Sequence, residues 1–168
     1  LSRLTACQST LTLNDTSVSK FERNKLINKV FGNSIKNTFK IYSLNINSEK
    51  NIIGCSAEHN GYEKKFGCIH KREILLDKEN NYIKGSDQIF KKKDGIPIRY
   101  VFRFHINPEL TVVKTMGGNS ALIQFSKNKS LIFTITDGTL EIEKSIFLGG
   151  KKILDNTCIT ISGNLVNK

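Results

Sequence analysis

The stretch RYVFRFHI, residues 99–106, alternates between aromatic and mostly basic side chains. In an extended chain Tyr100, Phe102 and Phe104 share one face, and Arg99, Val101, Arg103 and His105 share the other. The stretches SALIQF (120–125), SLIFTIT (130–136), LEIEKSIFL (140–148) and CITISG (158–163) alternate in the same way. Turns rich in Gly, Asn and Asp separate them, so the sequence predicts an all-β fold, an antiparallel β-sandwich.

Only VSKFERNKLINKVFGN, residues 18–33, could form a helix. Its apolar residues fit a helical period in part, so a short helix and a loop are both open here. No internal repeat, low-complexity segment or linker interrupts the chain. We therefore expect one domain over residues 1–168.

The composition indicates a folded, basic protein. Of the 168 residues, 38% are hydrophobic, which is enough for a core. Lys and Arg number 26 against 15 Asp and Glu, a formal net charge of +11. Such an excess favours polyanionic partners, although it also serves solubility. No run of 18 apolar residues occurs, so we expect no membrane span.

The four cysteines, Cys7, Cys55, Cys68 and Cys158, have neither CxxC nor zinc-finger spacing. Cys55 and Cys68 lie in apolar, strand-like surroundings. We expect buried free thiols, with a Cys55–Cys68 disulfide across paired strands as the alternative.

Motifs of common enzymes and nucleic-acid modules are missing. The chain has no GxxxxGK[ST], no HExxH, no GxSxG and no dinucleotide-binding fingerprint. It also lacks an RNP-like aromatic strand and a recognition-helix pattern, so no specific nucleic acid is expected.

The polar side chains concentrate in GCSAEHNGYEKKFGCIHKREILLD, residues 54–77. We interpret residues 51–59 as one strand, 60–65 as a turn or loop, and 66–77 as a second strand. On the second strand Cys68, His70, Arg72 and Ile74 share a face. The hairpin would bring His59 and Tyr62 near Lys64 and Lys65, and it could bring His70 close as well.

His, Tyr, Lys and Arg side chains together suit recognition of a carboxylate or a sulfate. The candidate substrate-binding residues are therefore His59, Tyr62, Lys64, His70 and Arg72. The alternative is structural: a solvated hairpin rim, or histidines bonded to a Tyr hydroxyl or a backbone carbonyl that anchor the sandwich.

Six blocks in order carry a family resemblance: CQSTLTLNDTS (7–17), HNGYEKKFGCIHKREILLD (59–77), RFHINPEL (103–110), GNSALIQF (118–125), IEKSIFLGG (142–150) and TCITISG (157–163). They resemble the C-terminal β-domain of the heparinase II/III-like family, and specifically its alphaproteobacterial branch. The resemblance runs from Cys7 to Gly163.

This resemblance implies a C-terminal antiparallel β-sandwich that accompanies an N-terminal (α/α) toroid. Characterised members are polysaccharide lyases that act by β-elimination on uronate-containing glycans. The residues themselves do not indicate a location, and the resemblance implies a periplasmic or cell-envelope one. In characterised members, Asn, Tyr and His side chains neutralise the uronate carboxylate and stabilise the enolate. Many members also hold zinc in the β-domain.

Residues 1–168 depart from the family pattern in two ways. The toroid, which carries the family's catalytic Tyr and Asn, is not among them, so we expect a fragment with no catalytic residue of its own. A family His that binds zinc falls at Gln8, beside Cys7, on an expected strand. Because an amide is a poor zinc ligand, we expect no metal site and no cofactor.

Three functional hypotheses remain. The first is the C-terminal domain of a polysaccharide lyase, inactive by itself, whose partners are an acidic polysaccharide and the toroid. The second is a non-catalytic glycan-binding or structural β-sandwich of a degenerate member. The third is a general polyanion or nucleic-acid binder, which only the charge suggests. Whether the chain is an enzyme thus stays open.

Overall fold

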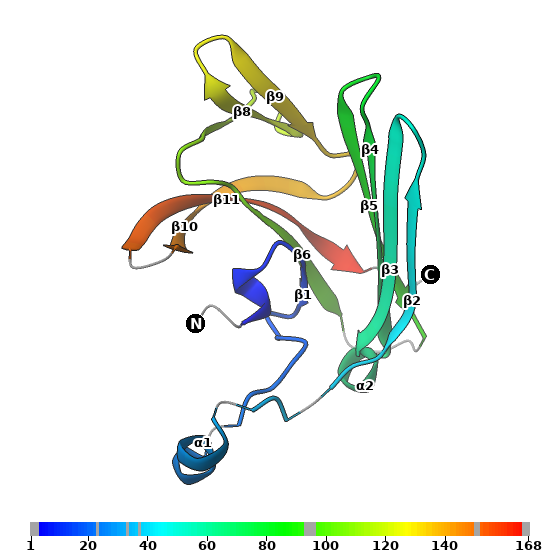
Figure 1. The fold of residues 1–168 in the computed structure, drawn as a ribbon, viewed down its shortest axis with the longest axis vertical. Coiled ribbons are helices and arrows are strands. Elements are labelled where there is room, and N and C mark those ends of the chain that lie inside the picture. Colours follow the sequence, from blue (N-terminus) through cyan, green and yellow to red (C-terminus); the bar gives the residue numbers. More distant parts are fainter. Residues whose placement is uncertain are drawn as a thin grey trace. The chain divides into compact units, whose positions relative to one another are not determined.

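The computed structural model describes residues 4–22, 24–32, 34–36, 38–92, 97–149 and 152–165. The chain divides into two compact units, one made of residues 1–17 and 97–168 and the other of residues 18–96. Figure 1 shows that strands dominate both. All their pairings are antiparallel, which confirms the predicted all-β, antiparallel β-sandwich class.

The first unit has a four-stranded sheet in the order β1-β6-β11-β10 and a three-stranded sheet in the order β7-β8-β9. The strands of the first sheet are β1 (Leu11–Leu13), β6 (Ile98–His105), β10 (Thr139–Gly149) and β11 (Lys152–Leu165). Those of the second are β7 (Thr111–Lys114), β8 (Ser120–Ser126) and β9 (Lys129–Thr134). The short turn η1 (Thr5–Cys7) precedes β1.

A shared core joins these two sheets. Ile123 of β8, Leu140 of β10 and Ile159 of β11 are buried in one cluster, and Phe104 of β6 packs against it. Phe102 is also buried, with 7% of its surface exposed. Val101, on the opposite face of β6, is buried as well, so both faces of this strand are covered.

The second unit contains a four-stranded sheet in the order β2-β3-β4-β5. Its strands are β2 (Ile41–Ser48), β3 (Ile52–Tyr62), β4 (Cys68–Asp77) and β5 (Tyr82–Lys91). The helix α1 (Lys25–Phe31) decides between the two alternatives for residues 18–33. The side chain of Asn24 caps it by accepting hydrogen bonds from the backbone N–H groups of Leu26 and Ile27.

The expectations about the cysteines were confirmed in part, and one about Gln8 was wrong. All four cysteines are free thiols and Cys68 and Cys158 are buried, as expected, but Cys7 and Cys55 are exposed. Cys55 lies opposite Ile74 rather than Cys68, so the alternative disulfide is not formed. Gln8 does not lie on a strand but ends η1, because a backbone hydrogen bond to Thr5 closes that turn.

No helix among the described residues has the length and apolar character needed to cross a membrane. The interpretation of residues 1–168 as one domain stays a prediction.

Candidate functional site

The candidate site forms where the β3–β4 hairpin turns. The predicted hairpin is present, but its connection is more ordered than a loop: β3 continues to Tyr62, and the short helix α2 (Glu63–Phe66) follows. Gly67 then adopts a left-handed conformation with φ 65°, which a glycine tolerates without strain. This turn sets the register in which His59 lies directly opposite His70.

Four polar side chains lie together on one face of this sheet. Strand pairing sets His59 opposite His70 and Arg72 opposite Asp87, and His70 and Arg72 share a face because they are two residues apart. The side chains of Arg72, His70 and Asp87 are mostly buried. We call His59, His70, Arg72 and Asp87 the histidine cluster.

Hydrogen bonds link the histidine cluster into a directed chain. The Gly61 N–H donates to Nδ1 of His59 at 3.1 Å, so the proton of the neutral His59 ring lies on Nε2. That Nε2 is 3.2 Å from Nδ1 of His70, which must then accept. The remaining nitrogen of His70, Nε2, donates to Oδ1 of Asp87 at 2.6 Å. Both rings therefore carry their proton on Nε2.

The electrostatics agree with a neutral His59. Burial, followed by the neighbouring His70 and the positive charge of Arg72, lowers the pKa of His59 from 6.5 to about 4. Burial by itself would raise the pKa of Asp87. Hydrogen bonds from His70 and Arg72, with the charge of Arg72, outweigh that effect and hold this pKa below its ordinary value.

Gly61 is needed for the close approach that starts this chain of hydrogen bonds. A Cβ atom at residue 61 would lie 2.2 Å from Cγ1 of Val18 and 3.1 Å from Nδ1 of His59. Any side chain there would therefore push the backbone N–H away from the imidazole.

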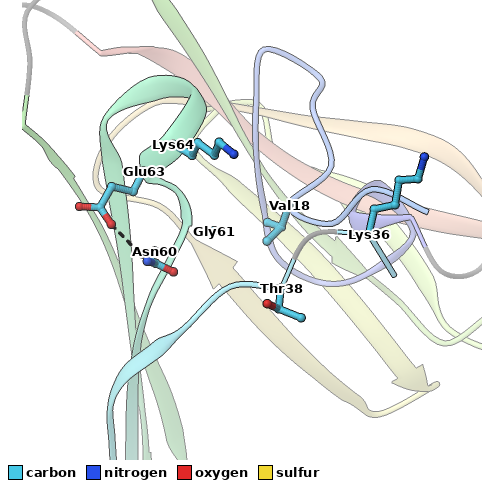
Figure 2. A pocket seen from close by; sticks show the side chains of 7 residues that line it. All are labelled: Val18, Lys36, Thr38, Asn60, Gly61, Glu63 and Lys64. Carbon is cyan, nitrogen blue, oxygen red and sulfur yellow. Dashed lines mark hydrogen bonds between the residues drawn. The ribbon is translucent and has the colours of Figure 1, made fainter. Parts of the chain in front are cut away.

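An open pocket of about 540 Å³ adjoins the turn. In Figure 2 Asn60, Gly61, Glu63 and Lys64 line one side, and Val18, Lys36 and Thr38 line the other. Glu63 is held by Lys92 at 2.6 Å, and hydrogen bonds from Lys92, Tyr42 and Asn60 lower its pKa. Lys36 pairs with Glu22 at 2.9 Å. Lys64 is exposed and, within the described part of the chain, forms no ion pair.

The five residues predicted to bind substrate thus occupy different environments. Tyr62 and His70 are buried, with 1% and 3% of their surfaces exposed. In the histidine cluster His59 is half-buried and the Arg72 side chain is mostly buried, and Lys64 lies on α2 beside the pocket. Their assignment to substrate binding stays a prediction.

Asp87 was missed by the sequence reasoning, although it is the residue to which His70 and Arg72 both donate. The sequence offers only a weak signal for it: Asp87 lies in the middle of YIKGSDQIFK, residues 82–91, the segment that follows the hairpin. A buried carboxylate requires a partner, and Arg72 on the preceding strand is the nearest basic residue that the alternation turns to that face.

Across the described residues, no group of three or more His, Cys, Asp or Glu side chains is arranged to hold a metal ion. Gln8 and Cys7 are both exposed at the end of η1. The expectation about zinc at this position stays a prediction.

Comparison with known proteins gives one family. The family described as "Heparinase II/III-like, C-terminal" matches residues 1–166. No curated protein and no solved structure matches the chain significantly.

Proposed function

The chain belongs to the heparinase II/III-like C-terminal family, and from this premise we propose that it is the β-domain of a polysaccharide lyase acting on uronate-containing acidic glycans. In this proposal β-elimination is performed by a longer protein. Residues 1–168 contribute glycan binding and no catalytic base. The observation that carries the proposal is the family match over nearly the whole chain.

The pocket beside α2 supports a role in glycan binding. Lys64 presents an exposed ammonium group that no acidic side chain in the described residues neutralises. In Figure 2 the hydroxyl of Thr38 lies across the pocket from Lys64, whereas Lys36, on the same side as Thr38, is paired with Glu22. A sulfate or carboxylate of a glycan would receive charge-assisted hydrogen bonds from the Lys64 ammonium group and the Thr38 hydroxyl. The excess of positive charge, +11, would attract the same polymer at longer range.

The histidine cluster supports a positioning role rather than direct contact. Both ring nitrogens of His59 are occupied, by Gly61 and by His70. Arg72 holds Asp87 with two hydrogen bonds, at 2.7 and 3.0 Å. These bonds fix the end of β3, and with it the Asn60 and Lys64 side of the pocket. In the proposal Lys64 contacts the glycan. The side chains that position the end of β3, and with it Lys64, are those of His59, Tyr62, His70 and Arg72.

The alternative is a non-catalytic glycan-binding or structural β-sandwich. Gln8 favours it, because this residue stands at a position where the family resemblance implies a zinc-binding His. The two proposals differ in the activity of the natural protein that contains residues 1–168.

Ultraviolet absorbance of the unsaturated uronate product tests the proposal. We expect the natural protein to release this product from a uronate-containing glycan and residues 1–168 alone to release none. Turnover by residues 1–168 alone would show that they contain a catalytic base. Failure of the natural protein on every uronate-containing glycan, with retained binding, would support the non-catalytic alternative instead.

A further inference from the structure

β2 is an open edge of the sheet in the second unit. The strand order β2-β3-β4-β5 leaves one side of β2 without a neighbour, as Figure 1 shows. Seven of its eight residues are exposed. Within the part of the chain that the structure describes, no backbone group of residues 41–48 has a hydrogen-bond partner outside β3. The N–H and C=O groups on this side are available to another strand.

The side chains of β2 do not protect this edge. Its sequence, IYSLNINS, contains no charged residue and no proline, although 24% of the chain is charged. The opposite edge, β5, carries Lys84, Asp87 and Lys91. Natural edge strands usually carry charges or prolines that prevent pairing with another chain. Only β5 follows that rule.

We propose that β2 pairs antiparallel with β2 of a second copy of this chain, about a twofold axis through Asn45. The axis is perpendicular to the sheet, so the same face of the sheet points in the same direction in both copies. Residues that meet across the axis must then share a face. The two four-stranded sheets would form one continuous sheet of about eight strands.

The sequence of β2 matches itself in this arrangement. With Asn45 opposite Asn45 of the second copy, Leu44 lies opposite Ile46 of the second copy, and Ser43 opposite Asn47. Each cross-strand pair joins apolar to apolar or polar to polar side chains, the favourable combinations in a sheet. Leu44 and Ile46 already face Ala57 and Cys55 of β3, so the apolar row continues across the axis.

The bulge in β2 and the side-chain pairs together select this register among the symmetric ones. The pairing of β2 with β3 is irregular between Ile41 and Ser43 and regular from Ser43 to Ser48. Centring the axis on Leu44 would draw Ile41 and the bulge into the new ladder. Centring it on Ile46 would give a regular ladder of the same length as Asn45 does, but it would set the apolar Leu44 opposite the polar Ser48. Asn45 therefore avoids the bulge and keeps apolar residues opposite apolar ones.

Charge favours a second copy over a polyanion or an acidic peptide at this edge. Because β2 is neutral, two chains of net charge +11 can meet here without placing a charge in the ladder. A charged partner would find no opposite charge along IYSLNINS. The twofold pairing also consumes both open β2 edges, so the assembly closes as a dimer.

Sedimentation velocity of residues 1–168 tests the proposal at physiological salt. We expect a dimer that dissociates on dilution, and a monomer for Leu44→Lys at every concentration. The matched control is Ile83→Lys on β5, because Leu44 and Ile83 are 63% and 64% exposed and lie on the same face at opposite edges. This control should sediment as the wild type does. A wild-type monomer throughout, or equal loss of the dimer in both variants, would overturn the proposal.

Disulfide trapping checks the register without a destabilising charge. In a background with the exposed Cys7 and Cys55 changed to Ser, Asn45→Cys places two thiols directly opposite each other. Opposite Cα atoms in antiparallel strands are about 4.5–5.5 Å apart, which suits a disulfide. In the same background Asn47→Cys puts the thiols about 13 Å apart along the strand. We expect oxidation to cross-link only Asn45→Cys; cross-linking of both variants or of neither would contradict the register.

Discussion

Asp87 lies directly opposite Arg72 in the β4–β5 pairing, and its two carboxylate oxygens accept hydrogen bonds from Nε and Nη2 of Arg72 at 2.7 and 3.0 Å. The same Oδ1 also accepts the proton of His70 Nε2. This one carboxylate thus connects the two strands that form the base of the candidate site.

Replacing Asp87 by Ala should lower the free energy of unfolding by about 2 kcal/mol, because a mostly buried Arg and His lose a charged acceptor. Urea unfolding measures this change. The control is Glu73→Ala on the other face of β4, where Glu73 pairs with Lys71 at 2.7 Å in a more exposed position. That substitution should change stability by less than about 0.5 kcal/mol. Equal effects of the two variants would contradict a special role for Asp87.

Stability should fall as the pH decreases from about 6.5 to about 4. The pKa of His59 is about 4 in the folded chain against 6.5 for the free side chain. In this interval the unfolded chain binds a proton at His59 that the folded chain does not, so acid favours unfolding. Below pH 4 the protein should lose further stability, because the pKa of Asp87 is lowered in the folded chain and protonation of its carboxylate then favours unfolding.

The variant His59→Gln should reduce the slope of stability against pH in this interval, as measured by chemical unfolding at a series of pH values. The variant His105→Gln serves as control, because His105 lies in the other unit and bonds instead to Ala6 and Ser145. An unchanged slope in His59→Gln would show that His59 titrates normally in the folded chain.

Lys64→Ala should elute from immobilised heparin at lower salt than Lys78→Ala. Both variants lose one exposed positive charge, but only Lys64 borders the pocket. The extra loss should be at most about fivefold in affinity, or ~1 kcal/mol, as for other exposed ion pairs. Identical elution of the two variants would mean that net charge alone retains the chain.

A chelator should leave the thermal midpoint of the chain unchanged. Gln8 offers a neutral amide oxygen, which binds zinc far more weakly than an imidazole nitrogen. It is also exposed at the end of η1. Gln8→His should not by itself recruit zinc. Stoichiometric zinc in the purified wild-type chain, measured by elemental analysis, together with a large loss of midpoint on chelation, would refute this expectation.

The fold class followed from local pattern, because side-chain alternation and turn residues act over a few positions. The strands around Phe102, Ile123 and Ile159 were found in this way, and so was the hairpin that pairs His59 with His70. Strands that lack clear alternation or are very short, such as β1 and β7, were not named. Their formation depends on neighbours far away in the sequence, as the pairing of Leu11 with Phe102 shows.

The candidate site was predicted in part for the same reason. The residues of one hairpin are close in sequence, whereas Asp87 enters from β5 and its position depends on register. The local sequence pattern also does not predict how deeply each side chain is buried. Nothing in HNGY, residues 59–62, distinguishes the buried Tyr62 from the half-buried His59. The division of the candidate residues between contact and support therefore required the structure.

The hydrogen-bond chain through the histidine cluster restricts which amino acids can be substituted within it. Its first group, the backbone N–H of Gly61, can only donate, and its last, the ionised carboxylate of Asp87, can only accept. Each side chain between them must accept on one side and donate on the other. Imidazoles and carboxamides satisfy that rule, while Lys, Arg and aliphatic side chains break the chain. In related sequences we therefore expect residues 59 and 70 to vary together, within the small set of side chains that can donate one hydrogen bond and accept another.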